Sequence, residues 1–284
     1  MLSYWFTPQS PLCTACMQAS CCRDRGLIGG KCSLANWLQN AVAECVAQLP
    51  YPVLDKVLFG NHSLSLPLQV AVQHLIGPER ESTFMLDGHE FHCYTSQKVF
   101  FERSNIEREV MRAALPFMKP SATVYDVGAN IGFWLVRAAA RCEHCVGFEP
   151  SPANLILLRR NAGHLPGVTI VEAAVSSFTG SIRLSEDGTR TRVGAGEIEV
   201  PCITLDSYQG LPPTLIIIDV EGHAGEVVTG GMNLVAKHRP AFIVELHNPP
   251  EQERVVSLLS GQSYSIENLE HSQDFPFHIL ATAK

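Results

Sequence analysis

Two kinds of hydrophobic pattern alternate along the second half of the chain. Short runs of apolar and β-favouring residues predict parallel strands at 123–127, 145–148, 168–173, 215–220 and 241–246. Segments with apolar residues at every third or fourth position predict helices at 131–141, 152–162, 223–237 and 251–259. Repeated strand–helix alternation is typical of a parallel sheet with helices on both faces. We therefore expect an α/β fold with a doubly wound, mostly parallel sheet.

The rest of the chain adds smaller elements and an N-terminal extension. Hairpin-like runs occur at 181–185 and 198–204, and two final runs, 264–269 and 277–282, predict antiparallel strands. Upstream, the spacing predicts a helix over 104–118 and β-like segments near 83–94. We divide the chain into three parts. They are a Cys-rich N-terminal extension (1–50), an α+β lead-in region (51–119) and the α/β domain (120–284).

A glycine turn follows the first predicted strand of this domain. The run Val-Tyr-Asp-Val ends at Val127 and leads into Gly128-Ala-Asn-Ile-Gly132 and then a helical pattern. Such a strand–turn–helix lets a cofactor lie against bare backbone at the carboxyl end of the strand. About twenty residues later the next strand ends at Glu149, an acid that can accept hydrogen bonds from ribose hydroxyls.

Two cofactor classes fit a glycine turn of this kind. Dinucleotide sites use Gly-x-Gly-x-x-Gly, because a pyrophosphate must approach the helix start. Here Asn130 occupies the second glycine position, which argues against a pyrophosphate. S-adenosylmethionine carries no phosphate. Asp126 and Gly128 suit its amino-acid end, Glu149 its ribose, and the small residues around Ala174 the border of its adenine.

Six sequence blocks together resemble the FkbM-type S-adenosylmethionine-dependent methyltransferases. They are Asp126–Gly132, Phe148–Pro150, Ala174–Ser176, Thr204–Asp206, Ile218–Gly222 and Glu245–His247. The resemblance covers about residues 100–282 and implies a class I, Rossmann-like methyltransferase fold and usually O-methylation, often of sugar hydroxyls. It places the cofactor among six residues: Asp126, Gly128, Asn130, Gly132, Glu149 and Ala174. Two positions depart from the family pattern, because Ile217 stands where members often carry Lys and Ala224 where they often carry an acid.

Polar residues gather where two of the predicted strands end. Asp219 and Glu221 follow one strand, and Glu245 and His247 close the next. Residues two apart point to the same side of a strand, and both strand ends face the same crevice of a doubly wound sheet. A hydroxyl acceptor needs its proton removed or its pKa lowered. We expect Asp219, Glu221 and His247 to handle the acceptor, with His247 or an acid as base. A divalent metal on Asp219, Glu221 and Glu245 is a variant that we do not adopt.

The distribution of charged and apolar residues limits the classes of partner that we expect for the chain. Residues 1–119 carry equal numbers of basic and acidic side chains, and the rest carries 11 basic and 18 acidic ones, which gives the net charge of −7. A binder of duplex nucleic acid would show a basic patch, so we expect no nucleic-acid partner. No apolar run reaches the roughly 20 residues that cross a bilayer. We expect a soluble, cytoplasmic protein, and the sequence leaves organellar targeting and the oligomeric state open.

Cysteine is concentrated near the N-terminus, with six of ten cysteines in the first 45 residues. Cys13 and Cys16, and again Cys142 and Cys145, have the spacing of metal knuckles. No second pair follows at zinc-ribbon spacing, so we predict no metal site, and we expect Cys142 and Cys145 to act as small apolar residues at a buried strand.

We interpret the chain as an S-adenosylmethionine-dependent methyltransferase that methylates a hydroxyl of a small molecule such as a sugar. A methyltransferase-like binding module without activity is the first alternative, because Ile217 and Ala224 alter the substrate half of the pattern. An NAD(P)-dependent oxidoreductase on a similar sheet is the second, which Asn130 disfavours.

Overall fold

The computed structural model describes residues 81–94, 97–98, 108–187, 190–194, 196–270 and 275–284. The chain divides into two compact units. One unit contains residues 1–82 and 94–104 and lies almost entirely outside the described residues, as do the Cys13–Cys16 pair and the whole predicted extension. The other unit, residues 83–93 and 105–284, contains the predicted α/β domain.

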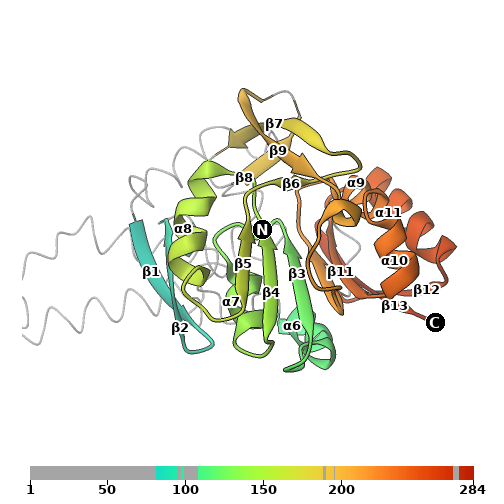
Figure 1. The fold of residues 1–284 in the computed structure, drawn as a ribbon, viewed down its shortest axis with the longest axis horizontal. Coiled ribbons are helices and arrows are strands. Elements are labelled where there is room, and N and C mark those ends of the chain that lie inside the picture. Colours follow the sequence, from blue (N-terminus) through green and yellow to red (C-terminus); the bar gives the residue numbers. More distant parts are fainter. Residues whose placement is uncertain (1–80, 95–96, 99–107, 188–189, 195, 271–274) are drawn as a thin grey trace, which may run out of the picture. The chain divides into compact units, whose positions relative to one another are not determined.

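A seven-stranded sheet forms the centre of the second unit (Figure 1). Its order is β12-β13-β11-β10-β3-β4-β5, and its strands are β3 (Thr123–Val127), β4 (His144–Phe148), β5 (Val168–Val171), β10 (Leu215–Ile218), β11 (Ala241–Leu246), β12 (Tyr264–Asn268) and β13 (Phe277–Ala283). Only β13 runs antiparallel to its neighbours. The predicted mostly parallel α/β sheet is confirmed, including its antiparallel C-terminal pair.

The central strands are apolar because both of their faces are covered. Every residue of β3, β10 and β11 is buried, and β10 reads Leu-Ile-Ile-Ile. Continuous apolar runs of this kind are typical of parallel strands between two helical layers. Polar residues in these strands therefore stand out, and Asp126 and Glu245 are both buried in them.

Helices lie on both sides of the sheet. They are α6 (Arg108–Ala114), α7 (Phe133–Ala139), α8 (Pro152–Ala162), α9 (Ala224–Thr229), α10 (Met232–His238) and α11 (Pro249–Gly261), with 3-10 turns η2 (Leu115–Phe117) and η3 (Leu205–Ser207). α7 packs against α8, and α9 packs against α11. Strand order runs outward in opposite directions from β3 and β10, so right-handed crossovers put these two pairs on opposite faces. In the described part, no helix is long and apolar enough to cross a bilayer.

One predicted helix is wrong in length. The single helix expected over 223–237 is two short helices that are interrupted at Gly230 and Gly231. A Cβ at Gly230 would stand 2.0 Å from the carbonyl oxygen of Ser176, and one at Gly231 would stand 3.0 Å from the Leu205 side chain. The chain bends there because neighbouring segments approach its backbone closely.

A four-stranded sheet lies near the carboxyl ends of the central strands (Figure 1). Its order is β6-β9-β7-β8, with β6 (Ala174–Val175), β9 (Ile198–Ile203), β7 (Gly180–Asp187) and β8 (Arg190–Val193). The predicted hairpin is confirmed as β7 and β9, and the segment between the two predicted strands contains the additional strand β8. The strand predicted over 168–173 ends at Val171, and β6 belongs to this second sheet.

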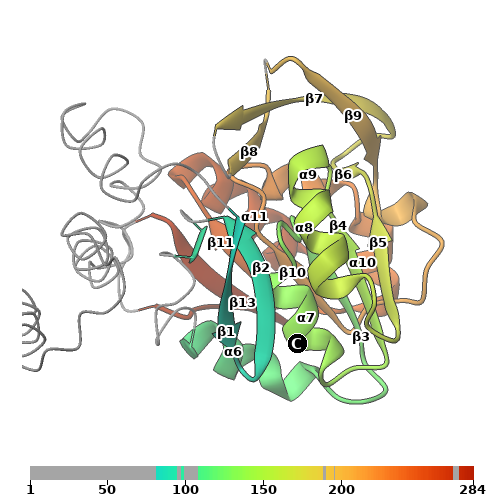
Figure 2. The ribbon, with the colours of Figure 1, turned by 90° about the vertical axis from the view of Figure 1, so that its left-hand side faces the viewer.

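A hairpin from the lead-in region packs on the domain (Figure 2). Its strands are β1 (Glu81–Leu86) and β2 (His89–Tyr94). The Phe91 ring lies 6.4 Å from that of Phe133 on α7, and Asp87 forms a 2.9 Å ion pair with Arg137. The boundary that we placed after residue 119 therefore lies inside the second compact unit.

Candidate active site

An open cleft lies where the strand order reverses between β3 and β10. In doubly wound sheets ligands bind at this point, outside the carboxyl ends of the strands. The lining comes from the ends of β3, β4 and β10 and from the small sheet: Val127, Gly128, Asn130, Phe148, Glu149, Pro150, Asn154, Ala173, Ala174, Val175, Leu184, Val193, Asp219, Val220, Glu221 and His223. Four of the six predicted cofactor residues and two of the three predicted catalytic residues are among them.

Gly128 forms the floor of the cleft. Its φ is +88°, and a Cβ there would stand 1.9 Å from the carbonyl oxygen of Asp219. Asp219 in turn donates its backbone N–H to Val127 at 3.0 Å. The two central strand ends thus meet at a position that only glycine fits, which leaves bare backbone for a ligand to approach.

Glu149 is the buried acid at the end of β4. Its carboxylate accepts the backbone N–H groups of Asn130 and Ser151, both at 2.8 Å, and contacts the side-chain amide of Asn154 at 3.4 Å. Burial raises the pKa of Glu149 to about 7 in spite of these hydrogen bonds. Ribose hydroxyls would add donors to an oxygen acceptor that already faces the cleft.

Small and apolar residues form the other end of the cleft. Ala173, Ala174 and Val175 line it from the chain around β6, and Leu184 and Val193 line it from β7 and β8. A flat apolar ring such as adenine fits a wall of this kind, with the small sheet supplying part of it. The signal that was missed is the alternation in 180–193, which brings Leu184 and Val193 to this wall.

Two predicted cofactor residues lie outside the cleft lining. Asp126 is buried within β3, beside Ile217 and Gly147 in register. Gly132, with φ +94°, precedes α7, and a Cβ there would stand 3.0 Å from Leu158 on α8. Gly132 thus allows close packing of two helices and contributes to the turn without lining the cleft.

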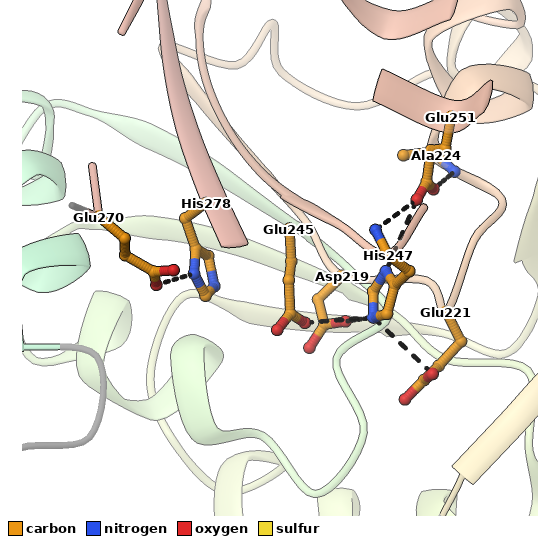
Figure 3. Close-up of polar contacts among 8 residues, drawn as sticks. All are labelled: Asp219, Glu221, Ala224, Glu245, His247, Glu251, Glu270 and His278. Atoms are coloured by element: carbon orange, nitrogen blue, oxygen red, sulfur yellow. Dashed lines mark hydrogen bonds and ion pairs between the residues drawn. The ribbon is translucent and has the colours of Figure 1, made fainter. Parts of the chain in front are cut away.

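Four acids surround His247 beside the cleft (Figure 3). Nε2 of His247 lies 3.5 Å from Glu245 and 3.7 Å from both Asp219 and Glu221. Nδ1 lies 3.7 Å from Glu251. The predicted convergence of Asp219, Glu221 and His247 is what the structure shows, and Glu245 joins them from β11.

These neighbours determine the charge of the imidazole. Burial disfavours the protonated ring, but Glu245, the contact with Glu251 and the charges of Glu221 and Asp219 outweigh burial and raise the pKa of His247 to about 10. A ring that is already protonated at neutral pH cannot accept a proton. Of the two kinds of base that we predicted, the geometry therefore favours an acid.

The pKa of Asp219 is also raised, which for an acid favours the uncharged form. Removal from bulk water and the adjacent Glu245 carboxyl, with which it shares a hydrogen bond, raise the pKa of Asp219 well above its usual value. The Asp219 side chain is still 43% exposed, whereas that of Glu245 is 5% exposed. A neighbouring carboxylate disfavours the ionised form of Asp219, because two negative charges at this distance repel each other.

Glu251 is a residue that the sequence reasoning missed. Its carboxylate accepts the backbone N–H of Ala224 and that of His247, both at 2.8 Å. It therefore ties the start of α9 to the end of β11. Its place four residues after His247, in the first turn of a helix that begins with two prolines, was the available signal.

The turn after β10 is held in an unusual conformation. Glu221 has φ +48° and the following Gly222 has φ +96°. A left-handed Glu is uncommon, and such residues cluster at functional sites where surrounding structure maintains them. His223, also missed, follows this turn, lines the cleft and contacts the Ser176 hydroxyl through Nε2 at 2.9 Å.

The metal variant raised by the sequence named Asp219, Glu221 and Glu245, and the structure groups a partly different set. Ligand atoms of Asp219, Glu245 and His247 lie within 4.8 Å of one another. Neither nitrogen of a protonated His247 has a lone pair for a metal, so metal binding at this cluster would require the ring to lose its proton. Cys142 and Cys145 are buried free thiols at the start of β4, in agreement with an apolar role.

Comparisons with known proteins agree with this geometry. Residues 126–277 match the model of the methyltransferase FkbM domain. The chain is similar to the hexuronic acid methyltransferase AglP of Haloferax volcanii, at 28% identity over 181 residues, or 60% of this chain and 75% of that protein.

Solved structures that are similar to this chain include a methyltransferase and a protein crystallised with AdoMet. Methyltransferase FkbM from Methylobacillus flagellatus is 17% identical with a TM-score of 0.47, and the match covers 87% of this chain and 60% of that chain. M. jannaschii TYW2, crystallised with AdoMet, is 14% identical with a TM-score of 0.47, over 73% of this chain and 86% of that chain.

Proposed function

The chain belongs to the FkbM family of methyltransferases, and we propose that it transfers the methyl group of S-adenosylmethionine to a hydroxyl oxygen of a sugar. The enzyme class and the cofactor follow from the family. One observation carries the chemistry: the Asp219 carboxyl lines the cleft beside the Gly128 turn, and Nε2 of His247 lies within 3.7 Å of it and of the Glu245 and Glu221 carboxyls.

Cofactor binding is assigned to the turn and the strand ends. The backbone around Gly128 receives the amino-acid end, Glu149 accepts from the ribose, and the chain at Ala174 borders the adenine. When bound, S-adenosylmethionine supplies a methyl group activated by its sulfonium. Acids line the cleft at three described positions, Glu149, Asp219 and Glu221, and this suits a positively charged cofactor.

Asp219 acts as the general base in this proposal. When the acceptor oxygen takes the methyl group, its proton would move to the Asp219 carboxylate, so that the products are a methyl ether, S-adenosylhomocysteine and a protonated Asp219. The raised pKa of Asp219 makes it a better proton acceptor than an ordinary carboxylate. The cationic His247 fixes the acids in place, and Glu221 orients the hydroxyl.

The charge of the site favours a hydroxyl over a carboxylate as the acceptor group. AglP is named for hexuronic acid, which offers both groups. Among the described lining residues there is no Lys or Arg, and two acids stand at the acceptor end. An acceptor carboxylate would be repelled there and needs no base, whereas a hydroxyl needs the base that the site provides.

The variant Asp219→Asn tests the base directly. We expect the folded variant to bind S-adenosylhomocysteine with unchanged affinity and to lose methyl transfer by on the order of 100-fold or more, the usual contribution of a general base. Asp206→Asn, outside the cleft, is the matched control and should keep full transfer.

Full transfer by Asp219→Asn would remove Asp219 from the mechanism. Each assay is run with and without a chelator. Loss of wild-type transfer when the chelator is present would assign the Asp219, Glu245 and His247 cluster to a metal. Loss of cofactor binding in the variant would instead place Asp219 in the cofactor site.

A further inference from the structure

A second histidine lies behind the carboxyl pair, outside the cleft lining. His278 on β13 has a 5% exposed side chain, and its Nδ1 lies 2.8 Å from Oε1 of Glu270. Glu270 follows β12 and is 33% exposed, so it connects the buried ring to the surface. Burying a charged ring costs free energy unless an opposite charge pairs with it, and Glu270 is in position to supply that charge to His278.

Strand register puts His278 next to the site. His278 is the direct partner of Glu245 in the antiparallel β11–β13 pair. Direct partners in an antiparallel pair lie on the same face, with Cβ atoms about 4.5–5.5 Å apart. Figure 3 shows the His278 ring between Glu270 on one side and Glu245 on the other. An acid–imidazole pair therefore stands directly behind the carboxyl that Asp219 contacts.

Acidic side chains and two histidines are interleaved around the His278–Glu270 pair. Glu270 and Glu245 flank His278; Asp219 and His247 lie beyond Glu245, and Glu221 and Glu251 flank His247. Burial and Glu245 raise the pKa of Asp219, and positive charge on His247 and then on His278 pulls it back down. With His278 neutral, the four acids around His247 would share its single positive charge.

We infer that the His278–Glu270 pair is a positioning pair for the proposed base, in which Glu270 keeps His278 protonated and His278 supplies the counter-charge behind Glu245. This inference rests on the proposed function. The pair touches neither substrate nor cofactor. It acts across Glu245, by keeping Asp219 able to release its proton and so to start each turnover ready to accept one.

Carbon-13 NMR titration of the Asp219 carboxyl tests the inference. The full chain is labelled at aspartate, saturated with S-adenosylhomocysteine, and the Asp219 signal is assigned by its loss in Asp219→Asn. We expect His278→Gln to raise the titration midpoint of Asp219 by roughly one pH unit, the effect of losing a nearby opposite charge. Glu270→Gln should move it in the same direction by a smaller amount.

The direction in which Glu270→Gln shifts the titration midpoint of Asp219 distinguishes the inference from a direct charge effect of Glu270. Removing an acid lowers the midpoint of a neighbouring acid by direct Coulomb interaction, whereas loss of the His278 charge raises it. Glu267→Gln, at an exposed position on β12, is the matched control and should leave the midpoint unchanged or slightly lower. If His278→Gln fails to fold, Glu270→Gln against Glu267→Gln still decides.

An unchanged or lowered midpoint in Glu270→Gln would overturn the inference, as would an unchanged midpoint in folded His278→Gln. The titration needs no acceptor, so it is independent of methyl transfer. A shifted midpoint in a protein that never methylates a hydroxyl would contradict the proposed function alone. Normal hydroxyl methylation with no shift would contradict the positioning pair alone.

Discussion

Gly128 is the residue at which the backbones of the two central strands come closest. We expect Gly128→Ala to lower the free energy of unfolding by at least about 2 kcal/mol, because the new Cβ meets the Asp219 carbonyl and the backbone is left-handed. Gly261→Ala is the control: nothing lies within 4 Å of a Cβ there, and alanine should stabilise the end of α11 by up to about 1 kcal/mol. Chemical denaturation measures both. Equal effects would show that the close approach does not constrain residue 128.

Glu149 makes cofactor binding depend on pH. Ribose hydroxyls donate to the ionised carboxylate, and the pKa of Glu149 is raised to about 7, so affinity should rise as pH passes upward through 7. Between pH 6 and pH 8 the ionised fraction, and with it the affinity for S-adenosylhomocysteine, should increase about tenfold. Calorimetry on wild type and Glu149→Gln checks this. A slope that persists in the variant would assign the dependence to another group.

Among single residues, the sequence predicted the acids and the histidine that the chemistry requires. It missed the residue that fixes their backbone in place. Asp219, Glu221 and His247 were predictable because they close neighbouring strands. Glu251 was not, because its two backbone hydrogen bonds join segments that are distant in sequence. The charge of His247 could not be predicted either, since it depends on four acids from three elements.

At the scale of elements, Asp206 joins two parts of the unit. Its carboxylate accepts the backbone N–H groups of Asn233 and Leu234, at the start of α10. Asp206→Ala should cost about 1 kcal/mol of stability, the usual effect of losing an N-terminal cap, and leave methyl transfer unchanged.

Thermal unfolding measures that cost, with Glu253→Ala on the exposed face of α11 as control. Destabilisation no greater than that of the control would mean that the cap contributes nothing, and a lost activity in a folded Asp206→Ala would bring this residue into the mechanism.

Element prediction succeeded where the local pattern is strong. The strands 123–127 and 241–246 and the helix 152–162 have the predicted bounds. The helix break at Gly230 and Gly231 was missed because contacts with Ser176 and Leu205 impose it. β8 was missed because its pairing with β7, and not its composition, makes it a strand.

The whole unit combines a cofactor cleft at the strand reversal with an acid cluster at its mouth. Sheet order places the Gly128 turn and Asp219 side by side, and the hairpin of β7 and β8 supplies the apolar wall. The alternation of strands and helices predicted this architecture. The acceptor was predicted only as a class, because a hydroxyl leaves no sequence pattern beyond the base that it needs.

The most direct test of the account is the chemical nature of the methylated product. The protein is incubated with methyl-labelled S-adenosylmethionine, a chelator and matched panels of neutral sugars and uronic acids, and the labelled products are treated with mild alkali. We expect label in an alkali-stable methyl ether, formed on neutral sugars at least as well as on uronic acids. Label that appears only on uronic acids and is released by alkali as methanol would identify a carboxylate acceptor and contradict the proposal.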